Sequence, residues 1–476
     1  MPEASRSRPR AVVLVGGPVA PYSRALRIAR ALAAEGFGVE IAAIAAPGLP
    51  DRETVSPYAQ GLARAPGAPH VGGAGTIELR RYRPAGPWRF LGASEGASGA
   101  AVRSGASAVA VARGGSGRVS TDAARSLLRV AARPVLTLRR WIFWPHAVRG
   151  WWATLARELA PADLYHAFGA LAIQPALAAR KGAPIGPGGG PARVIYDAID
   201  DIAGSNETMA LPGPIRRRIA RREREWARQA DAIVTVNDTL ARRLTSRFGR
   251  TDPILVVPNY PATRHADGLG TPSNLLRDAA GLDEATRVVL FQGRLGPGLG
   301  LETAAEAVLA VPGAALVLLG FGRGVADAQA RDRDPRTAGR HVTLPAVPPD
   351  ELLGWTASAD VMLIPLPPDS PNQRAATPNK FWEALAVGLP VVVVRGLDEM
   401  ARLVEEHDLG AVATSGSAED LAAAITSVLD RLTIDGPAWR DRITKTSAER
   451  FSWAAAETSY QDLVRQLTPI DRPAPG

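Results

Sequence analysis

The chain has 476 residues, of which 46% are hydrophobic, and this length and composition predict a globular protein of two or three domains. It has no cysteine, which excludes disulfides, thiolate metal sites and a cysteine nucleophile, and we expect a cytoplasmic location. No apolar run reaches the roughly 18 residues of a membrane span. The net charge of +9 comes almost entirely from arginine, but no nucleic-acid-binding module accompanies it, so nucleic acid is not an expected partner.

The first elements predict a β-α-β unit. Ala11–Val15 is an apolar strand that ends in Gly16 and Gly17, Tyr22–Ala34 has apolar residues at helical spacing, and Val39–Ile44 is the next strand. Such a unit predicts a parallel sheet, and open parallel sheets bind ligands at the carboxyl ends of their strands, here beside the two glycines. The turn lacks the pattern G-x-G-x-x-G, so a nicotinamide cofactor is not expected.

Residues of about 85–150 are expected to be an insertion in the first domain. Gly92–Gly117 is rich in Ala, Gly and Ser, whereas Ala123–Arg157 carries seven arginines and no acidic residue. The second part also contains five large aromatic residues: Trp141, Phe143, Trp144, Trp151 and Trp152. A basic stretch with tryptophans suits the interface of an anionic membrane, which predicts that Arg125–Trp152 docks on the inner face of a membrane. The alternative is that these aromatics pack inside the domain while the arginines face water.

The rest of the first half alternates strands and helices. A strand over Leu164–Phe168 carries His166 near its end, and a strand over Arg193–Tyr196 is followed by three aspartates: Asp197, Asp200 and Asp201. Aspartates at this spacing are a weak signal for a metal site, because no further ligand lies nearby in the sequence. The segment Pro261–Gly281, with scattered Pro, Gly and polar residues, is expected to be a linker.

A second series of strands and helices begins after this linker. Strands are expected at Val288–Gln292, Ala315–Leu319, His341–Leu344, Val361–Leu366, Val391–Val394 and Ala411–Ala413. The chain is therefore expected to form two doubly wound α/β domains with a cleft between them. We place the first domain at residues 1–265, the second at residues 282–435, and C-terminal helices at residues 436–476.

The stretch Ala376–Val394 predicts a helix followed at once by a buried strand. Thr377 suits the N-cap of this helix, and Pro378 suits its first position. Three polar residues share one face of the helix: Asn379, Lys380 and Glu383. A helix N-terminus offers free N–H groups and a partial positive charge, so a phosphate could bind there beside the lysine. An amphipathic helix with a solvated Lys–Glu pair is the alternative.

Four segments of the second half fall where predicted strands end: Gln292–Leu295, Gly320–Gly324, Ala346–Pro348 and Thr377–Glu383. Because the carboxyl ends of parallel strands converge on one crevice, these segments are expected to meet. Their glycines, Arg294, Lys380 and a helix N-terminus together predict a diphosphate site. Glu383 could bind the paired hydroxyls of a ribose.

These motifs resemble those of bacterial glycosyltransferases of family 4, which have the GT-B architecture of two facing Rossmann-like domains. The most specific matches are QGRL, TPNKFWEALAVGLPVV, and the first-half run VIYDAIDD, DAIVTVNDTLARRL and VVPNYP. The C-terminal helix that begins with FSW also matches, and in the family this helix crosses back to the first domain. The resemblance covers nearly the whole chain and is weakest over residues of about 85–150.

The resemblance implies transfer of a sugar from a nucleotide-sugar donor, with UDP-sugars as the default, with retention at the anomeric carbon and without a metal or a cofactor. The acceptor would be a lipid-linked glycan or a small molecule, as in cell-surface glycan or glycolipid synthesis. Arg294 and Lys380 would neutralise the leaving diphosphate, and His166 loosely matches a first-domain histidine near the reacting sugar. The residues expected to bind the donor are Gly16, Gly17, Gly293, Gly320, Phe321, Val347, Pro378, Asn379 and Glu383.

Three positions depart from the pattern of the family. Ala375 stands where many members carry the first of two glutamates, Leu299 stands where many carry a phosphate-binding lysine, and the family histidine often falls at Phe168. The first two departures motivate a rival interpretation, a non-catalytic nucleotide-sugar-binding relative or scaffold. A second alternative is another GT-B enzyme, such as a phosphorylase or an epimerase. A phosphorylase that depends on pyridoxal phosphate needs a Schiff-base lysine, and the only lysines are Lys181, Lys380 and Lys445.

Overall fold

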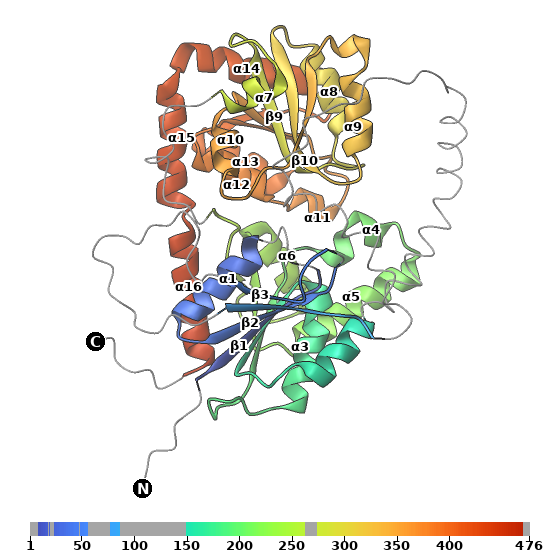
Figure 1. Cartoon of the computed structure of the whole chain (residues 1–476), viewed down its shortest axis with the longest axis vertical. Helices are drawn as coiled ribbons and strands as arrows, with labels where there is room; N and C mark the ends of the chain where they lie inside the picture. Colours follow the sequence, from blue (N-terminus) through green and yellow to red (C-terminus); the bar gives the residue numbers. More distant parts are fainter. Residues whose placement is uncertain are drawn as a thin grey trace.

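Two α/β domains, each built around its own sheet, make up the chain, as the sequence predicts (Figure 1). The computed structural model describes residues 8–17, 19, 23–46, 48–55, 77–85, 149–261 and 274–469. The first domain, blue to green in Figure 1, lies below the second, which is yellow to orange. This arrangement confirms the expected GT-B type of architecture.

The sheet of the first domain has the strand order β3-β4-β2-β1-β5-β6-β7-β8. Its strands are β1 (Arg10–Val15), β2 (Gly38–Ile44), β3 (Arg52–Val55), β4 (Ile77–Tyr82), β5 (Leu164–Phe168), β6 (Arg193–Asp197), β7 (Ala232–Thr235) and β8 (Leu255–Val256). All neighbours are parallel except β3 and β4, which are antiparallel. The edge strand β3 was not expected, because its sequence, RETV, lacks the continuous apolar run of a strand covered on both faces.

Helices cover both faces of this sheet. They are α1 (Ser23–Ala34), a helix over residues 149–158, α3 (Ala170–Gly182), α4 (Asn206–Met209), α5 (Gly213–Ala227) and α6 (Asp238–Phe248), with a 3₁₀ turn at Ile202–Gly204. Val12 and Leu14 of β1 face a core shared with the helix over residues 149–158 and with α3, whereas Ala11 and Val13 face α1 on the other side. The alternation follows from the period of two of a strand, and burial on both faces explains the unbroken apolar run.

The sheet of the second domain is fully parallel, with the order β11-β10-β9-β12-β13-β14. Its strands are β9 (Arg287–Arg294), β10 (Ala314–Phe321), β11 (His341–Pro345), β12 (Val361–Ile364), β13 (Val391–Val394) and β14 (Gly410–Ala413). Its helices are α7 (Leu275–Ala280), α8 (Leu301–Leu309), α9 (Val325–Asp332), α10 (Leu352–Ala357), α11 (Pro371–Arg374), α12 (Asn379–Ala386), α13 (Asp398–His407) and α14 (Ala418–Asp435), with a 3₁₀ turn at Pro335–Thr337. The helix α7 lies inside the segment that we expected to be a linker, so that expectation is wrong for its last residues.

The last two helices connect the domains. α15 (Pro437–Arg450) packs against α12 and α14 of the second domain, and α16 (Trp453–Leu467) packs against α1 of the first. Figure 1 shows them as consecutive red helices beside the upper and the lower domain. Arg465 of α16 pairs with Glu35, which follows α1, at 2.6 Å. The chain therefore returns to the domain in which it began.

The two described tryptophans of the proposed membrane segment belong to the core of the first domain. Trp151 is fully buried and donates from Nε1 to the carbonyl of Ala43 at 3.2 Å, and the half-buried Trp152 donates to the carbonyl of Leu171 at 3.0 Å. The membrane prediction is wrong for these two residues, because their indoles fill the space between the sheet and its helices. Residues 125–148 lie outside the described residues.

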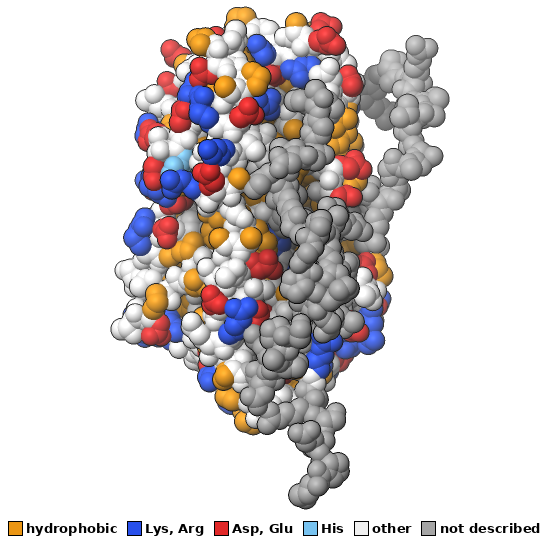
Figure 2. All heavy atoms as spheres, turned by 90° about the vertical axis from the view of Figure 1, so that its left-hand side faces the viewer, with side chains coloured by type: hydrophobic (Ala, Val, Ile, Leu, Met, Phe, Trp, Pro, Cys, Tyr) orange, Lys and Arg blue, Asp and Glu red, His pale blue; other side chains and the backbone are white. Residues whose placement is uncertain are grey.

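The surface that carries α15 and α16 faces the viewer in Figure 2. Basic and acidic side chains are interspersed over the coloured part of this face and do not separate into one patch of a single sign. Among the described helices, none has the length and apolar character needed to cross a membrane.

Candidate functional site

The helix α12 begins at the junction between the domains. Its N-cap is Pro378, with no side chain capping the helix, and Thr377 lies one residue outside it. The predicted N-cap at Thr377 is therefore wrong by one position. The hydroxyl of Thr377 instead accepts a hydrogen bond from the Asn237 amide of the first domain at 3.1 Å. Pro378 and Asn379 are both half-buried at the start of the helix.

Lys380 lies in the first turn of α12 and points at the end of β9. Its ammonium sits 3.3 Å from the ring centroid of the buried Phe291, a cation–π contact. Gly293 has a φ of 106°, a backbone conformation that favours glycine, and a Cβ there would be in ordinary van der Waals contact with the lysine, 3.9 Å from Nζ. Desolvation lowers the pKa of Lys380 to about 7; Arg294 lowers it further and Glu383 opposes the shift. A dianionic ligand at this point would favour the charged lysine.

Glu383 lies one turn deeper in α12 and is held by Gln292, the residue before Gly293. The Gln292 amide nitrogen donates to Oε2 of Glu383 at 2.7 Å, and its carbonyl oxygen accepts from the Thr356 hydroxyl at 2.8 Å. Burial raises the pKa of Glu383, while Gln292, Arg27 and Lys380 act against this rise. The carboxylate is thereby oriented by a buried amide whose own position is fixed.

The ends of β9 and β10 form the second wall of the site. Gly293 pairs with Gly320 and Arg294 pairs with Phe321 in the parallel register. A Cβ at Gly320 would overlap the carbonyl oxygen of Gly293, so glycine is required there for the two strands to approach. The Arg294 side chain is exposed at the strand end. These residues, Lys380 and Glu383 are the part of the prediction that the structure brings together.

Other predicted donor-binding residues have packing roles that the structure makes visible. A Cβ at Gly16 would lie 2.7 Å from the Cβ of Leu171, so glycine lets α3 approach the end of β1. The carbonyl of Gly17 accepts from the Ile44 amide at 3.1 Å, which joins the ends of β1 and β2. Val347 is half-buried against the core of the second domain. Leu299 packs against the same core, which accounts for an apolar residue at that position.

Arg27 is a cation of the first domain that the sequence motifs did not identify. It lies on α1, is 7% exposed, and stacks over the Trp453 ring with its guanidinium carbon 5.2 Å from the centroid. Its Nε and Nη2 atoms are buried with no hydrogen-bond partner among the described residues. Burial lowers its pKa to about 9, Arg24 and Arg30 lower it further, and Glu383 of the second domain opposes the shift. The helical spacing of Arg24 and Arg27 was visible in the sequence, but it could not distinguish this arginine from a solvated one.

His166 occupies a different place from the one predicted. It lies in the middle of β5, not at its end, and its side chain is fully buried. Its Nε2 is 3.1 Å from Oδ2 of Asp197, and its Nδ1 is 3.0 Å from the hydroxyl of Tyr460. Both ring nitrogens are thus engaged inside the first domain, so in this structure the ring does not face the cleft. A lone histidine in a strand is satisfied here by partners distant in sequence.

The aspartates after β6 form ion pairs and hydrogen bonds within the protein. Burial alone would raise the pKa of Asp197, but the bidentate contact with Arg24, at 2.8 and 2.9 Å, and the contact with His166 hold that pKa below its usual value. Asp201 pairs with Arg247, with Nη2 and Oδ2 3.0 Å apart, and Asp200 accepts from the Asn372 amide at 3.1 Å. No group of three or more metal-ligating side chains occurs in the described part of the chain.

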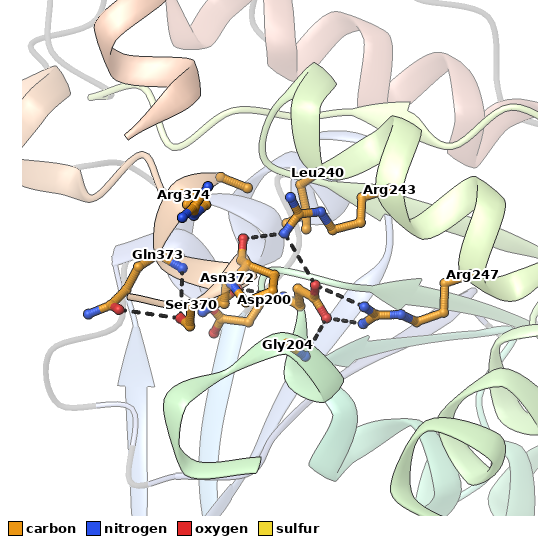
Figure 3. Close-up of polar contacts among 12 residues, drawn as sticks. Asp200, Gly204, Leu240, Arg243, Arg247, Ser370, Asn372, Gln373 and Arg374 are labelled. Atoms are coloured by element: carbon orange, nitrogen blue, oxygen red, sulfur yellow. Dashed lines mark hydrogen bonds and ion pairs between the residues drawn. The ribbon is translucent and has the colours of Figure 1, made fainter. Parts of the chain in front are cut away.

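Several contacts join the first domain to the segment that leads into α12. Asn372 of α11 accepts from the backbone amide of Asp201 at 2.6 Å and donates to Asp200, and Arg243 donates to the carbonyl of Pro371 (Figure 3). The Asn237 amide also donates to the carbonyl of Ala375 at 2.7 Å, and the Ala375 side chain is buried against the core of the first domain. Position 375 is therefore an interdomain packing position in this chain.

Two family models match the chain, one in each domain. Residues 93–260 match the glycosyl transferase 4-like domain, and residues 286–431 match the model described as glycosyl transferases group 1. No curated protein matches the sequence.

Solved structures similar to this chain include GT-B enzymes of low sequence identity. Sucrose-phosphate synthase from Thermosynechococcus elongatus has a TM-score of 0.63 at 17% identity, with 97% of this chain and 99% of that one covered. Anabaena HepE in complex with UDP has a TM-score of 0.58 at 15% identity, covering 96% and 100%. The E. coli trehalose-6-phosphate structure with UDP-2-fluoro glucose has a TM-score of 0.59 at 12% identity, covering 96% and 99%. At these identities the likeness concerns the fold, and together with the two family matches it indicates that the chain is a glycosyltransferase of the GT-B type.

Proposed function

We propose that this glycosyltransferase, of family 4 type, transfers a sugar from a UDP-sugar to an acceptor, with retention at the anomeric carbon and without a metal ion. The observation that carries the proposal is the grouping of Lys380, Glu383 and Arg294 around the glycine-lined ends of β9 and β10. UDP as the nucleotide is supported by the similar fold of HepE, which binds UDP, although the two chains share only 15% identity.

The cations of this site would act on the leaving group. Negative charge grows on the diphosphate oxygen as the bond to the sugar breaks, so a cation aimed at that oxygen stabilises the transition state more than the ground state. Lys380 and Arg294 are the second-domain cations that the site offers for this purpose, and Arg27 would add a cation from the first domain. Because desolvation brings the pKa of Lys380 to about 7, binding of a diphosphate would restore its full positive charge near neutral pH.

Glu383 would bind the ribose of the nucleotide. Gln292 occupies Oε2, while Oε1 makes no hydrogen bond to any described residue and so can accept from a ribose hydroxyl. Arg27 and Lys380 oppose the rise of the Glu383 pKa that burial causes, and a carboxyl in its ionised form accepts hydrogen bonds roughly twice as strong as a neutral group does. The acceptor would be a lipid-linked glycan or a small molecule, in the synthesis of a cell-surface glycan or glycolipid.

The experiment that tests this proposal measures binding and turnover separately. Thermal shift with UDP, GDP and ADP, and with their sugars, should show the largest stabilisation with UDP compounds, since a ligand that binds the folded state raises its apparent stability. UDP release from a UDP-sugar is then measured, first in buffer, where water is the acceptor, and then after addition of an extract that contains the acceptor. Binding without any turnover would favour the second candidate function, a non-catalytic nucleotide-sugar-binding relative. The observation that favours this candidate is Ala375, a buried alanine at the position where many family members carry a glutamate.

A further inference from the structure

A pocket of about 330 Å³ lies on the first domain, outside the proposed donor site, and arginine dominates its lining. Its arginines are Arg52 of β3, Arg80 and Arg81 of β4, Arg83 after β4, and Arg157 of the helix over residues 149–158. Two acidic residues, Asp51 and Glu158, also line the pocket, so arginine outnumbers acid in its lining. The excess of positive charge makes the pocket suited to an anion.

Three of the arginines form ion pairs with carboxylates of the first domain. Arg80 pairs with Glu158 at 2.9 Å, and its guanidinium carbon lies 4.4 Å from the centroid of the Tyr82 ring. Arg83 pairs with Asp51 at 2.9 Å. Arg81 is 4% exposed and donates to the carbonyl of Pro50 at 2.6 Å, besides its pair with Glu53 at 3.3 Å. The Arg80 guanidinium has therefore lost part of its conformational freedom before a ligand binds, whereas Arg81 is buried and the Arg83–Asp51 pair is exposed to water.

The other two arginines, Arg52 and Arg157, form no such ion pair with a described residue. Arg52 and Arg157 are exposed and make no hydrogen bond or ion pair with the residues that the structure describes. They belong to different elements that line one pocket, an edge strand and a helix. Two of the residues that line the pocket are joined to each other, because the buried Thr154 hydroxyl donates to the carbonyl of Arg83 at 2.8 Å. The guanidinium groups of Arg52 and Arg157 are not neutralised by a described carboxylate, so both could bind the same anion in the pocket.

The pocket lies at a defined end of the first-domain sheet. Tyr82, which lines it, pairs with Ile44 in the sheet, and the Ile44 amide donates to the carbonyl of Gly17. The pocket therefore lies at the same end of the sheet as the glycines after β1. Strand β4 is two strands from β1, which corresponds to roughly 10 Å at the usual spacing of neighbouring strands. An extended molecule could reach from the pocket towards the glycines after β1.

We propose that this pocket binds a phosphate group, as a monoester or diester carried by a molecule other than the nucleotide. Arginine forks match phosphate oxygens in pairs, and a phosphate offers enough oxygens for guanidinium groups on both sides of the pocket. Two sources share this chemistry, a soluble phosphate ester and the headgroup of an anionic lipid. The site goes beyond the proposed function, because the donor residues are not part of it.

Charge reversal of Arg52 and Arg157 tests the site. We would titrate glycerol 3-phosphate into the full chain by calorimetry, with and without saturating UDP, and measure co-sedimentation with vesicles of phosphatidylglycerol and phosphatidylcholine. The test variant is Arg52→Glu/Arg157→Glu. The matched control is Arg216→Glu/Arg218→Glu on the exposed face of α5, which changes the net charge equally. Circular dichroism checks that both variants fold, and Arg52→Gln/Arg157→Gln serves as the milder variant.

We expect the parent chain to bind, and the test variant to bind with an affinity at least tenfold lower, because one charge-assisted hydrogen bond to a phosphate is worth about tenfold in affinity. The affinity of the control variant should stay within about twofold of that of the parent chain. Binding of glycerol 3-phosphate identifies a soluble ester as the source, and binding of phosphatidylglycerol vesicles alone identifies a lipid headgroup. Three results would overturn the proposal: no binding in either assay, equal binding by the test variant, or an equal loss in the control. Because the titration is also made without UDP, failure of UDP to bind would count against the proposed function and leave this test intact.

Discussion

The hydroxyl of Tyr460 lies 3.0 Å from Nδ1 of His166, so the last helix of the chain is hydrogen-bonded to a central strand of the first sheet. The carboxylate of Asp197 accepts from Nε2, the other ring nitrogen, so both nitrogens of the imidazole have a partner. Arg24, paired with Asp197, also donates to the carbonyl of Val257, which follows β8. One buried network thus joins α1, β5, β6 and α16 inside the first domain.

Removal of the tyrosine hydroxyl should weaken this network without affecting the donor site. Tyr460→Phe is expected to lower the free energy of unfolding by about 1–3 kcal/mol, because Nδ1 would be left buried without a partner. Urea unfolding measures the change, and Ser459→Ala, an exposed hydroxyl on the same helix, is the control. UDP affinity should stay as in the parent chain. A specific loss of turnover with unchanged stability would instead support the predicted contact of His166 with the sugar.

Loss of either second-domain cation should slow the reaction. Arg294→Ala and Lys380→Ala are each expected to reduce turnover about a hundredfold, roughly 3 kcal/mol, by analogy with the loss of one preorganised donor to the developing charge. UDP release measured under single-turnover conditions reports this effect. Lys445→Ala, an exposed lysine on α15, is the matched control. Near-normal turnover in both variants would place the diphosphate elsewhere.

The ribose contact should be separable from the phosphate contacts. Glu383→Gln removes the charge of the carboxylate, so the affinity for uridine and for UDP should fall by the same factor, roughly ten- to a hundredfold. Thr356→Val, which leaves the Gln292 carbonyl without its donor, should weaken both ligands less. Calorimetry with the nucleoside and the nucleotide checks the comparison. If only UDP binding fell, Glu383 would act on the diphosphate and not on the ribose.

The low pKa of Lys380 predicts that UDP binding depends on pH. Below about pH 7 the lysine of the free protein is already charged, so it contributes no pH dependence there. Above that value the charged fraction falls about tenfold for each pH unit, whereas a bound diphosphate raises the pKa, so affinity should fall and binding should take up a proton. Calorimetry between pH 7 and 9 in buffers of different ionisation enthalpy measures both quantities. Lys380→Arg should remove this dependence, and its persistence in that variant would assign it to another group.

Replacement of Arg27 should leave the stability of the fold intact and weaken the binding of UDP. Its guanidinium is buried with two nitrogens that lack partners among the described residues, so Arg27→Met is expected to leave the chain at least as stable as the parent. UDP affinity should nevertheless fall about tenfold, because the variant removes a positive charge that would act on the nucleotide or on Glu383. Arg30→Met on the same helix removes an equal charge as a control. An unchanged UDP affinity in Arg27→Met would remove this arginine from the site.

Local patterns in the sequence determined the architecture and the second-domain site. Alternating apolar runs and helical spacings predict two parallel α/β domains, and the glycines after β9 and β10 and the start of α12 fall at strand ends that must converge. Lys380 and Glu383 could be named because residues three and four apart on a helix share a face. These relations depend only on neighbours within a few residues of one another, or on the regular geometry of a parallel sheet.

The tertiary structure decided burial and the partners that come from distant segments. His166 and Tyr460 are 294 residues apart, and no local pattern shows that α16 would fill the first-domain face and occupy the imidazole. Trp151 and Arg27 likewise lie in basic surroundings in the sequence, yet both are buried by contacts with other elements. Whether a polar or aromatic side chain meets water, a ligand or the core depends on which elements pack around it, and that packing is a property of the whole folded chain.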